Sequence, residues 1–395
     1  MSFHGDEPDG IGSLGSMTTH PRPRLIVVAH SLDASDGGME TVHVRLIHEL
    51  RDEFEVIAVA CRLDPSLEGV IAFERIRVPT TPAPLRFAAF YLAATRRLRR
   101  LRAMGDVVHT CGAIVGGRVD VASIHTLSAA VVAARGGKLA PTGAPPIRRL
   151  NSGLLRWMAL RAELHCYRPR RLGIAAAVSE ATADEVRAFY PGVAVAVTPN
   201  GVDTTRFAPD ATVRSIERDS LGIANEQFVA LFVGGDFERK GLGIAIEALQ
   251  ASPSTVLVAA GPGDLARAGE VAASSGVKDR VHLLGPRRDV ERLDQMADVY
   301  VCASDYEADS LALLEAAASG LALVSTRVGS APSFITDADC GVLVDREPRV
   351  LGEALEQLAA DRAGVALMGE RARQAAQVRS WARAAEAVAA LFRRG

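Results

Sequence analysis

Short apolar runs alternate with amphipathic stretches from about residue 24 almost to the end of the chain, and this alternation restricts the fold more than any other feature. A parallel strand is buried on both faces and forms a continuous apolar run, while the helix that leads to the next strand is amphipathic. The pattern predicts an α/β fold with doubly wound parallel sheets. The runs that predict strands are residues 24–30, 54–61, 106–109, 119–124, 173–178, 194–197, 228–233, 255–260, 281–284, 299–303 and 322–325.

The predicted strands form two series, which indicates two domains. The chain has 395 residues, more than one hydrophobic core normally serves. The turn-forming cluster Pro199-Asn-Gly-Val-Asp203 separates the series. We therefore expect Rossmann-like domains at residues 24–198 and 199–379, with a ligand site in the cleft between them. Residues 380–395 are predicted to form a helix that crosses back to the first domain, and residues 1–23 a disordered tail.

The composition is typical of a globular enzyme of the cytoplasm. Charged residues make up 23% and hydrophobic residues 48% of the chain. A formal net charge of −2 gives no general reason to expect nucleic-acid binding. The five cysteines lack the paired spacing of a disulfide framework or a zinc site, so reduced thiols are expected. No apolar stretch approaches the ~18 uninterrupted residues of a membrane span.

Two glutamates frame the segment Glu307-Ala-Asp-Ser-Leu-Ala-Leu-Leu-Glu315. The segment follows a predicted strand and leads into a short helix that Ser310 or Asp309 would cap. A helix start attracts phosphate through its unpaired N–H groups and its dipole, and each carboxylate could bind hydroxyls of a polyol beside that phosphate. Taken alone, the spacing more often belongs to two surface carboxylates of an ordinary α/β protein.

A second cluster, Phe232-Val-Gly-Gly-Asp-Phe-Glu-Arg-Lys-Gly241, follows another predicted strand. Arg239 and Lys240 would place two cations at the C-terminal edge of the second sheet, where α/β folds bind anions. Lys240 stands out because only three of the 45 basic residues are lysines. Exposed loop charges are the alternative interpretation.

Further candidates lie in the first domain. Gly37 and Gly38 stand between a predicted strand and a predicted helix, where glycines let the backbone approach a phosphate, although a plain tight turn would use them equally. His125 follows the predicted strand 119–124 and could exchange a hydrogen bond or a proton with a sugar hydroxyl, although lone histidines are more often structural.

Arginines gather in two predicted helices, in Arg96-Arg-Leu-Arg-Arg-Leu-Arg102 and between Arg148 and Arg161. Leucines and a tryptophan are interleaved with them. A solvated helix face is the simpler interpretation, and binding to anionic lipid headgroups is the sharper one.

Together these segments resemble the family 4 retaining glycosyltransferases, which have the GT-B fold, over nearly the whole chain from about residue 24. The matching motifs occur in family order: Gly-Gly-Met-Glu40, Asp-Val-Val-His109, Ile-His-Thr126, Ala-Val-Ser-Glu180, Pro-Asn-Gly-Val-Asp203, the Arg239-Lys240-Gly241 loop, Ala-Ala-Gly-Pro-Gly263, His-Leu-Leu-Gly285 and the Glu307/Glu315 pair. The stretch from Gly234 to Gly241 is similar to the lipopolysaccharide-core glucosyltransferase branch.

The resemblance implies that the second domain holds a nucleoside-diphosphate sugar, such as a UDP-sugar, and that a hexose passes to a hydroxyl acceptor with retention. Arg239 and Lys240 would neutralise the leaving diphosphate in place of a metal, so no metal and no cofactor are expected. Glu307 would hold the sugar hydroxyls, Glu315 the ribose, and His125 the sugar or the reaction centre. The other donor-binding residues that the resemblance implies are Gly37, Gly38, Asn200, Gly234, Gly285, Arg287, Asp309, Ser310 and Leu311.

Two positions depart from the family pattern. Gly235 stands where many members have an arginine, so Arg239 would serve two roles or the diphosphate would be held more weakly. Asp309 and Ser310 replace the usual Phe-Gly inside the glutamate motif, and a side chain there would narrow the donor-sugar pocket.

Several alternatives stay open at this point. A nucleotide-sugar epimerase of the same fold would isomerise the donor, a sugar-nucleotide-binding subunit would not turn over, and a glycogen-type phosphorylase would need a pyridoxal lysine. The acceptor could be a lipid, an envelope glycan or a small secondary metabolite. A lipid acceptor suits the arginine-rich helices and peripheral contact with the inner face of a membrane, while a small acceptor suits the mobile loop predicted at 135–146.

Overall fold

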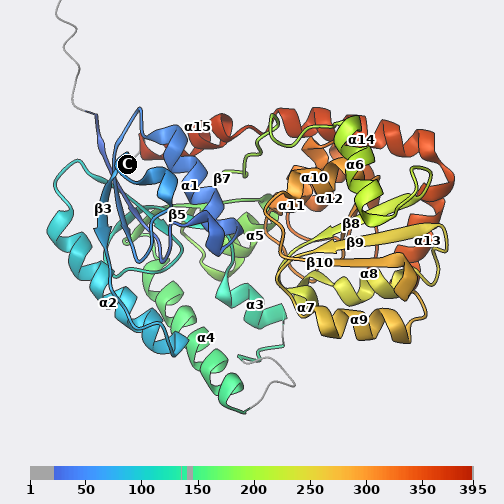
Figure 1. Ribbon diagram of the computed structural model, residues 1–395. Coiled ribbons are helices and arrows are strands. Elements are labelled where there is room, and N and C mark those ends of the chain that lie inside the picture. The colour runs from blue at the N-terminus through green and yellow to red at the C-terminus, as the bar shows by residue number, and fades with distance from the viewer. Residues whose placement is uncertain (1–21, 135, 140–145, 394–395) are drawn as a thin grey trace, which may run out of the picture.

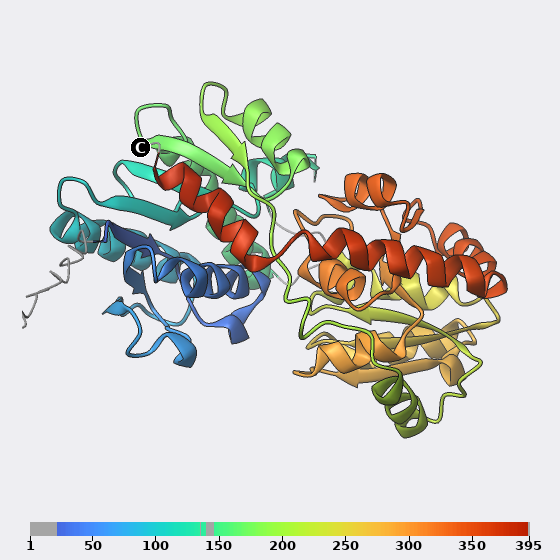
Figure 2. The ribbon, with the colours of Figure 1, turned by 90° about the horizontal axis from the view of Figure 1, so that it is seen from above.

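The computed structural model describes residues 22–134, 136–139 and 146–393. These residues form two α/β units, which lie side by side and are linked by two segments that cross between them (Figures 1 and 2). Residues 1–21, most of the predicted tail, and residues 135 and 140–145 of the predicted mobile loop lie outside the described residues.

Each unit is built on one parallel sheet, which confirms the predicted doubly wound architecture. The strand order is β3-β2-β1-β4-β5-β6-β7 in the first unit and β10-β9-β8-β11-β12-β13 in the second. The first sheet contains β1 (Arg24–Val28), β2 (Glu55–Ala60), β3 (Ala72–Arg75), β4 (Val107–Cys111), β5 (Val119–Ile124), β6 (Leu172–Ala177) and β7 (Ala194–Val197). The second contains β8 (Phe228–Val233), β9 (Thr255–Ala260), β10 (Val281–Gly285), β11 (Val299–Cys302), β12 (Ala322–Ser325) and β13 (Gly341–Leu343).

The order of strands reverses at one point in each sheet, between β1 and β4 and between β8 and β11. The connections on either side of such a point leave in opposite directions, so a crevice opens at the C-terminal ends of the strands. The loops that carry the predicted donor residues follow β8 and β11. The topology therefore brings these two loops together.

Helices cover both faces of each sheet (Figure 1). In the first unit they are η1 (Ala34–Asp36), α1 (Gly38–Leu50), η2 (Pro65–Leu67), α2 (Ala83–Leu101), α3 (Ser128–Ala134), α4 (Pro146–Cys166) and α5 (Glu180–Phe189). In the second they are α6 (Ala211–Leu221), α7 (Phe237–Lys240), α8 (Leu242–Ala248), α9 (Leu265–Ser274), η3 (Lys278–Arg280), α10 (Val290–Met296), α11 (Leu311–Ala318), α12 (Ala331–Ala338), α13 (Pro348–Ala360) and α14 (Arg362–Gln377). No helix of this described part is long and apolar enough to cross a bilayer.

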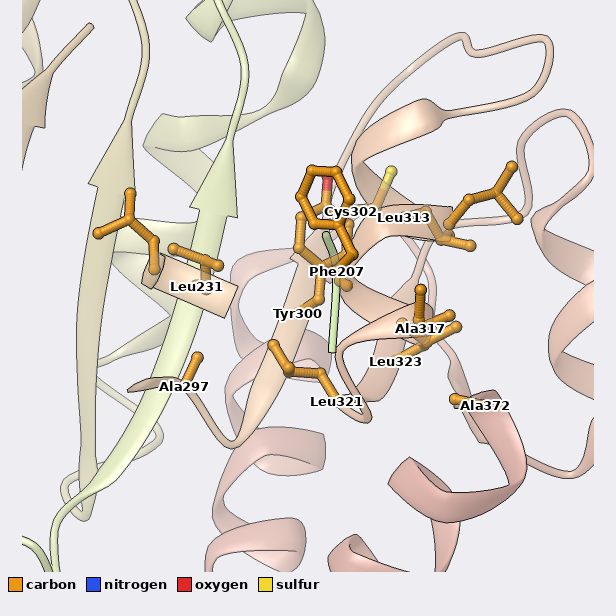
Figure 3. Packing of buried hydrophobic residues seen from close by; sticks show 14 of the residues in the cluster. Phe207, Leu231, Ala297, Tyr300, Cys302, Leu313, Ala317, Leu321, Leu323 and Ala372 are labelled. Carbon is orange, nitrogen blue, oxygen red and sulfur yellow. The ribbon is translucent and has the colours of Figure 1, made fainter. Parts of the chain in front are cut away.

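The alternation of side chains along each central strand builds two hydrophobic cores per sheet. On β1, Leu25 and Val27 enter one core while Ile26 and Val28 enter the other. In the second unit, Figure 3 shows how Tyr300 of β11 packs with Leu313 and Ala317 of α11. This packing fixes α11 against the sheet and thereby fixes the loop that precedes it.

The last helix, α15 (Trp381–Phe392), packs on the first unit although the helix before it belongs to the second (Figure 2). Its Phe392 ring lies 5.6 Å from that of Phe54, centroid to centroid. The chain crosses beside the earlier connection, where Val202 pairs with Ser380. Two adjacent segments therefore join the units.

Candidate active site

A cleft of about 1010 Å³ lies between the two units at the C-terminal ends of both sheets. The first unit contributes the start of α1, the residues after β5 and one face of α4. The second contributes the loops after β8 and β11 and the first turns of α11. The cleft thus occupies the place that the strand order favours for a ligand.

The loop after β8 leaves space for the side chain of Lys240. Asp236 caps the short helix α7 by accepting a hydrogen bond from the backbone N–H of Arg239, and Gly241 ends it with φ 77°. The side chain of Lys240 then folds back over Gly234: a Cβ at Gly234 would lie 2.1 Å from the Cδ of Lys240. Gly234 is therefore required because any side chain there would displace Lys240.

Glu307, in the loop after β11, is the point where the two loops meet. One of its oxygens, Oε1, lies 2.9 Å from Lys240 Nζ and 3.1 Å from a terminal nitrogen of Arg239, and it accepts a hydrogen bond of 3.0 Å from Ser304. Burial favours a raised pKa for Glu307, but the adjacent Lys240 and Arg239 outweigh it and lower the pKa. The cluster is therefore an ionised carboxylate that holds two cations at the cleft.

The start of α11 presents backbone N–H groups to the cleft. Ser310 is the N-cap residue, and its hydroxyl accepts a hydrogen bond of 3.4 Å from the N–H of Leu313. Glu315 lies on the same helix and also lines the cleft. Among the described residues it has no hydrogen-bond or ion-pair partner, and burial raises its pKa to about 7. This end of the cleft combines a helix dipole with a carboxyl group that has free acceptors.

Asp309 is hydrogen-bonded to both segments that cross between the units. Its buried carboxylate accepts hydrogen bonds from the Asn200 N–H at 2.8 Å, from the Ser330 hydroxyl and from Arg379 at 3.0 Å. The Asn200 amide in turn donates to the Asp309 carbonyl at 3.0 Å. Asn200 and Arg379 belong to different crossings, so the position of this loop depends on both.

In the first unit, the structure places Gly38 and His125 at the cleft. A Cβ at Gly38 would lie 3.6 Å from Leu311 of the other unit, so the two units approach closely here. Burial, followed by the influence of His43, lowers the pKa of His125 to about 3, so this imidazole is neutral at neutral pH. It can therefore take part in hydrogen bonds without carrying a charge.

Most of the predicted site residues line this cleft: Gly38, His125, Asn200, Gly234, Arg239, Lys240, Glu307, Asp309, Ser310, Leu311 and Glu315. Gly37, Gly285 and Arg287 do not. Arg287 forms hydrogen bonds of 2.7 and 2.6 Å with Asp289, and the Gly285 carbonyl accepts one from Gly261. A role for these three residues in donor binding stays a prediction.

Several residues that shape the site are not among those predicted from the sequence. Ser304 supports Glu307, Arg379 supports Asp309, and His43 lies beside His125 with 5.3 Å between the ring centroids. Ser304 lies three residues before Glu307 at the end of a strand, which is a usable signal. Arg379 and His43 are distant in sequence from their partners and have no local signal. Within the described ranges, no three His, Cys, Asp or Glu side chains are grouped so that they could hold a metal ion.

Comparisons with known families match both halves of the chain. The model described as "Glycosyltransferase Family 4" matches residues 36–206, and the model "Glycosyl transferases group 1" matches residues 213–377. A D-inositol 3-phosphate glycosyltransferase of Xylanimonas cellulosilytica is 30% identical over 72% of this chain and 70% of its own.

Other relatives match over shorter stretches. The lipopolysaccharide glucosyltransferase WaaG of Escherichia coli K12 is 35% identical over 33% of this chain and 36% of its own length. A D-inositol 3-phosphate glycosyltransferase of Corynebacterium diphtheriae is 35% identical over 54% of each chain. These two matches thus span only about a third and about half of the relatives' length.

Solved structures share the fold. The crystal structure of WaaG superposes with a TM-score of 0.78 at 22% identity and covers 94% of this chain and all of that one (100%). The Anabaena protein HepE, crystallised with UDP, gives a TM-score of 0.70 at 17% identity and covers 94% and 100% of the two chains. These likenesses establish the GT-B arrangement of the two units.

Proposed function

Because the chain belongs to the family 4 glycosyltransferases, we propose that it moves a hexose from a nucleoside-diphosphate sugar to a hydroxyl acceptor with retention of configuration. The observation that carries the proposal is the cluster of Lys240, Arg239 and Glu307 at the cleft. It joins two cations to a carboxylate at the edge of the sheet where a diphosphate and its sugar would lie.

The proposed chemistry follows from the charges in the cleft. As the bond between the sugar C1 and the diphosphate oxygen breaks, negative charge develops on the leaving group next to Lys240, Arg239 and the N-terminus of α11. The acceptor oxygen attacks C1 from the same face, and its proton passes to the departing phosphate oxygen. Arg239 and Lys240 supply the charge that a metal ion supplies elsewhere, so we propose a reaction without metal or other cofactor.

The carboxylates would orient the donor. We assign Glu307 to the sugar hydroxyls and Glu315, with its free acceptors, to the ribose hydroxyls. Neutral His125 would contact the sugar from the opposite wall. The Asp309 carboxylate is engaged with Asn200, Ser330 and Arg379, so its backbone, more than its side chain, would face the sugar.

We propose a UDP-hexose as donor. The WaaG relative is named a glucosyltransferase, and HepE has been crystallised with UDP-glucose. A GDP-mannose-dependent mannosyltransferase of Mycolicibacterium smegmatis, 32% identical over 46% of this chain, makes GDP-mannose the first competitor. All five cysteines are free, which supports a reducing compartment such as the cytoplasm.

Alanine variants of Lys240 and Glu307 test this function. Each should lower the turnover of the donor, with or without acceptor, by about 10²–10³-fold, because stabilisation of the leaving group or orientation of the sugar is lost. Lys278, exposed on η3, offers a matched control, and Lys278→Ala should keep full turnover. Wild-type rates in both site variants would contradict the proposal. Isomerised donor without acceptor product would identify an epimerase, and a bound but unconsumed donor a binding subunit.

A further inference from the structure

Helix α4 carries five of its large apolar side chains on a face that points to solvent. The exposed fractions are 79% for Ile147, 72% for Leu150, 45% for Leu154, 49% for Trp157 and 49% for Leu164. Their spacing of three, four, three and seven residues places them on one side of the helix. A helix on the surface of a globular domain normally shows the opposite arrangement.

The opposite side of α4 is already occupied. Ser152, Leu155 and Ala159 line the cleft, and Ala162 and Cys166 enter the core of the first unit. Helix α2 packs beside α4 and adds two exposed leucines, Leu85 at 51% and Leu92 at 53% (Figure 1). Exposed apolar side chains therefore lie on two neighbouring helices of the first unit.

The charged side chains of the two helices are almost all positive. They contain nine arginines: Arg86, Arg96, Arg97, Arg99, Arg100, Arg148, Arg149, Arg156 and Arg161. Their only acidic residue, Glu163, is buried and accepts hydrogen bonds from the backbone of Ser128 and Ala129 and from the Tyr190 hydroxyl. The whole chain has a formal net charge of −2. Arg156 lines the cleft and Arg97 pairs with Glu74 at 3.3 Å, so the positive charge that these helices offer to solvent comes from the other seven arginines, all of them exposed.

We propose that this basic–apolar face, formed by the exposed leucines of α2, the apolar stripe of α4 and the seven exposed arginines of both helices, docks on an anionic lipid bilayer. Leucine and tryptophan enter the boundary between headgroups and acyl chains, while arginines bind the anionic headgroups. Arg161 stacks over Trp157, with 5.7 Å from guanidinium to ring, which suits an indole at that boundary.

A second copy of the chain would fit this face less well. A twofold dimer brings the same patch of each copy together, so the arginines of one copy would meet those of the other without acidic partners. An anionic bilayer instead neutralises them. Since the opposite side of α4 lines the cleft, docking would also place the cleft beside the membrane, where a lipid-borne hydroxyl could enter. This last point rests on the proposed function.

Cosedimentation of the full chain with phosphatidylcholine vesicles, with or without phosphatidylglycerol, tests the docking. Binding should require phosphatidylglycerol and weaken as salt screens the headgroups. The variant Arg148→Gln/Arg149→Gln should bind about thirtyfold more weakly, at about fivefold for each arginine near the surface. The variant Leu150→Ser/Trp157→Ser should also weaken binding, and this loss should be seen at low salt as well as at high salt. Ile216→Ser/Leu367→Ser, which changes side chains exposed at 52% and 48% on the second unit, is the matched control and should bind like the wild type.

Equal binding to both kinds of vesicle, binding to neither, or an equal loss in the control would overturn the proposal. A lipid-free dimer in sedimentation velocity that Leu150→Ser/Trp157→Ser dissociates would assign the face to a second copy instead. Thermal unfolding and nucleotide binding of each variant show that it is folded. Because vesicle binding needs no turnover, its failure would leave the proposed transferase activity untouched.

Discussion

The two glutamates that frame the loop after β11 have opposite environments. Glu307 is bound to Lys240, Arg239 and Ser304, whereas Glu315 has no partner among the described residues. Their pKa values differ accordingly, lowered for Glu307 by the two cations despite its burial, and raised for Glu315 by burial. One residue is thus an ionised anchor for cations, and the other is a carboxyl group that titrates near neutral pH.

Glu315 should make the stability of the protein depend on pH. Its pKa rises from 4.5 in the unfolded chain to about 7 in the fold, so the folded state binds the extra proton between these values. The free energy of unfolding therefore falls as the pH rises through this window. Glu315→Gln stays neutral, so its free energy of unfolding should rise relative to that of the wild type by about 2.5 kcal/mol between pH ~5 and pH ~8. Chemical denaturation at several pH values measures this difference, and a constant difference would contradict it.

Single residues were predictable from the sequence where the signal was local. The Glu307/Glu315 spacing, the rare Lys240 and the glycine at 234 are all visible in short segments, and the structure brings them to one cleft. The direct contact of Lys240 with Glu307 was not predictable. It depends on the order of β8 and β11 in the sheet, which places two distant loops side by side.

At the level of elements, the loop before α11 is clamped to both crossing segments through Asp309. Arg379→Ala would leave this buried carboxylate without its counter-charge and should lower the free energy of unfolding by about 3–5 kcal/mol. The double variant Asp309→Ala/Arg379→Ala should lose less than the sum of the two single variants, because the pair is coupled. Urea denaturation of the four proteins measures the coupling.

Arg371→Ala is the matched control for Arg379→Ala. Arg371 lies on α14, shortly before Arg379, and pairs with Asp339, whose side chain is 78% exposed. Its replacement should therefore lower the free energy of unfolding by no more than about 1 kcal/mol. An equal loss of stability in the two alanine variants would show that Asp309 is not an effective clamp.

Strands that contain an apolar run were predicted well, including the edge strands β7 and β10. Each apolar run in the sequence became a strand, and Ser310 caps α11 as one of two candidates. The strands β3 and β13 were missed. Both lie at the edge of a sheet, and β3 carries Glu74 and Arg75 while β13 has three residues. An edge strand can be short or carry charged residues, so these two strands have no apolar run that marks them.

At the level of the whole molecule, α15 makes the first unit depend on the end of the chain. Phe392 packs against Phe54 and lies within 5.4 Å of the His109 ring. Phe392→Ala should therefore destabilise the protein by about 3–5 kcal/mol. Calorimetry would detect this as a lower melting temperature. Phe189→Ala, at a phenylalanine that is 39% exposed, should cost far less, and equal effects of the two changes would argue against this role of α15.

The arrangement of the whole molecule was predictable in outline only. The motif order implied two facing domains. The contacts of Asp309 with Asn200 and Arg379, however, join segments that are 109 and 70 residues apart, and the exposure of the α4 stripe depends on how neighbouring helices pack. No local pattern contains that information.

Thermal-shift measurements with UDP, GDP and ADP test whether the cleft holds a nucleotide-sugar donor site built on Lys240. A ligand that binds only the folded state stabilises it in proportion to the logarithm of its concentration above Kd. The wild type and Lys278→Ala should show this shift with UDP, and Lys240→Ala should show little or none. The absence of a shift with all three nucleotides, or an undiminished shift in Lys240→Ala, would show that no such donor site depends on Lys240.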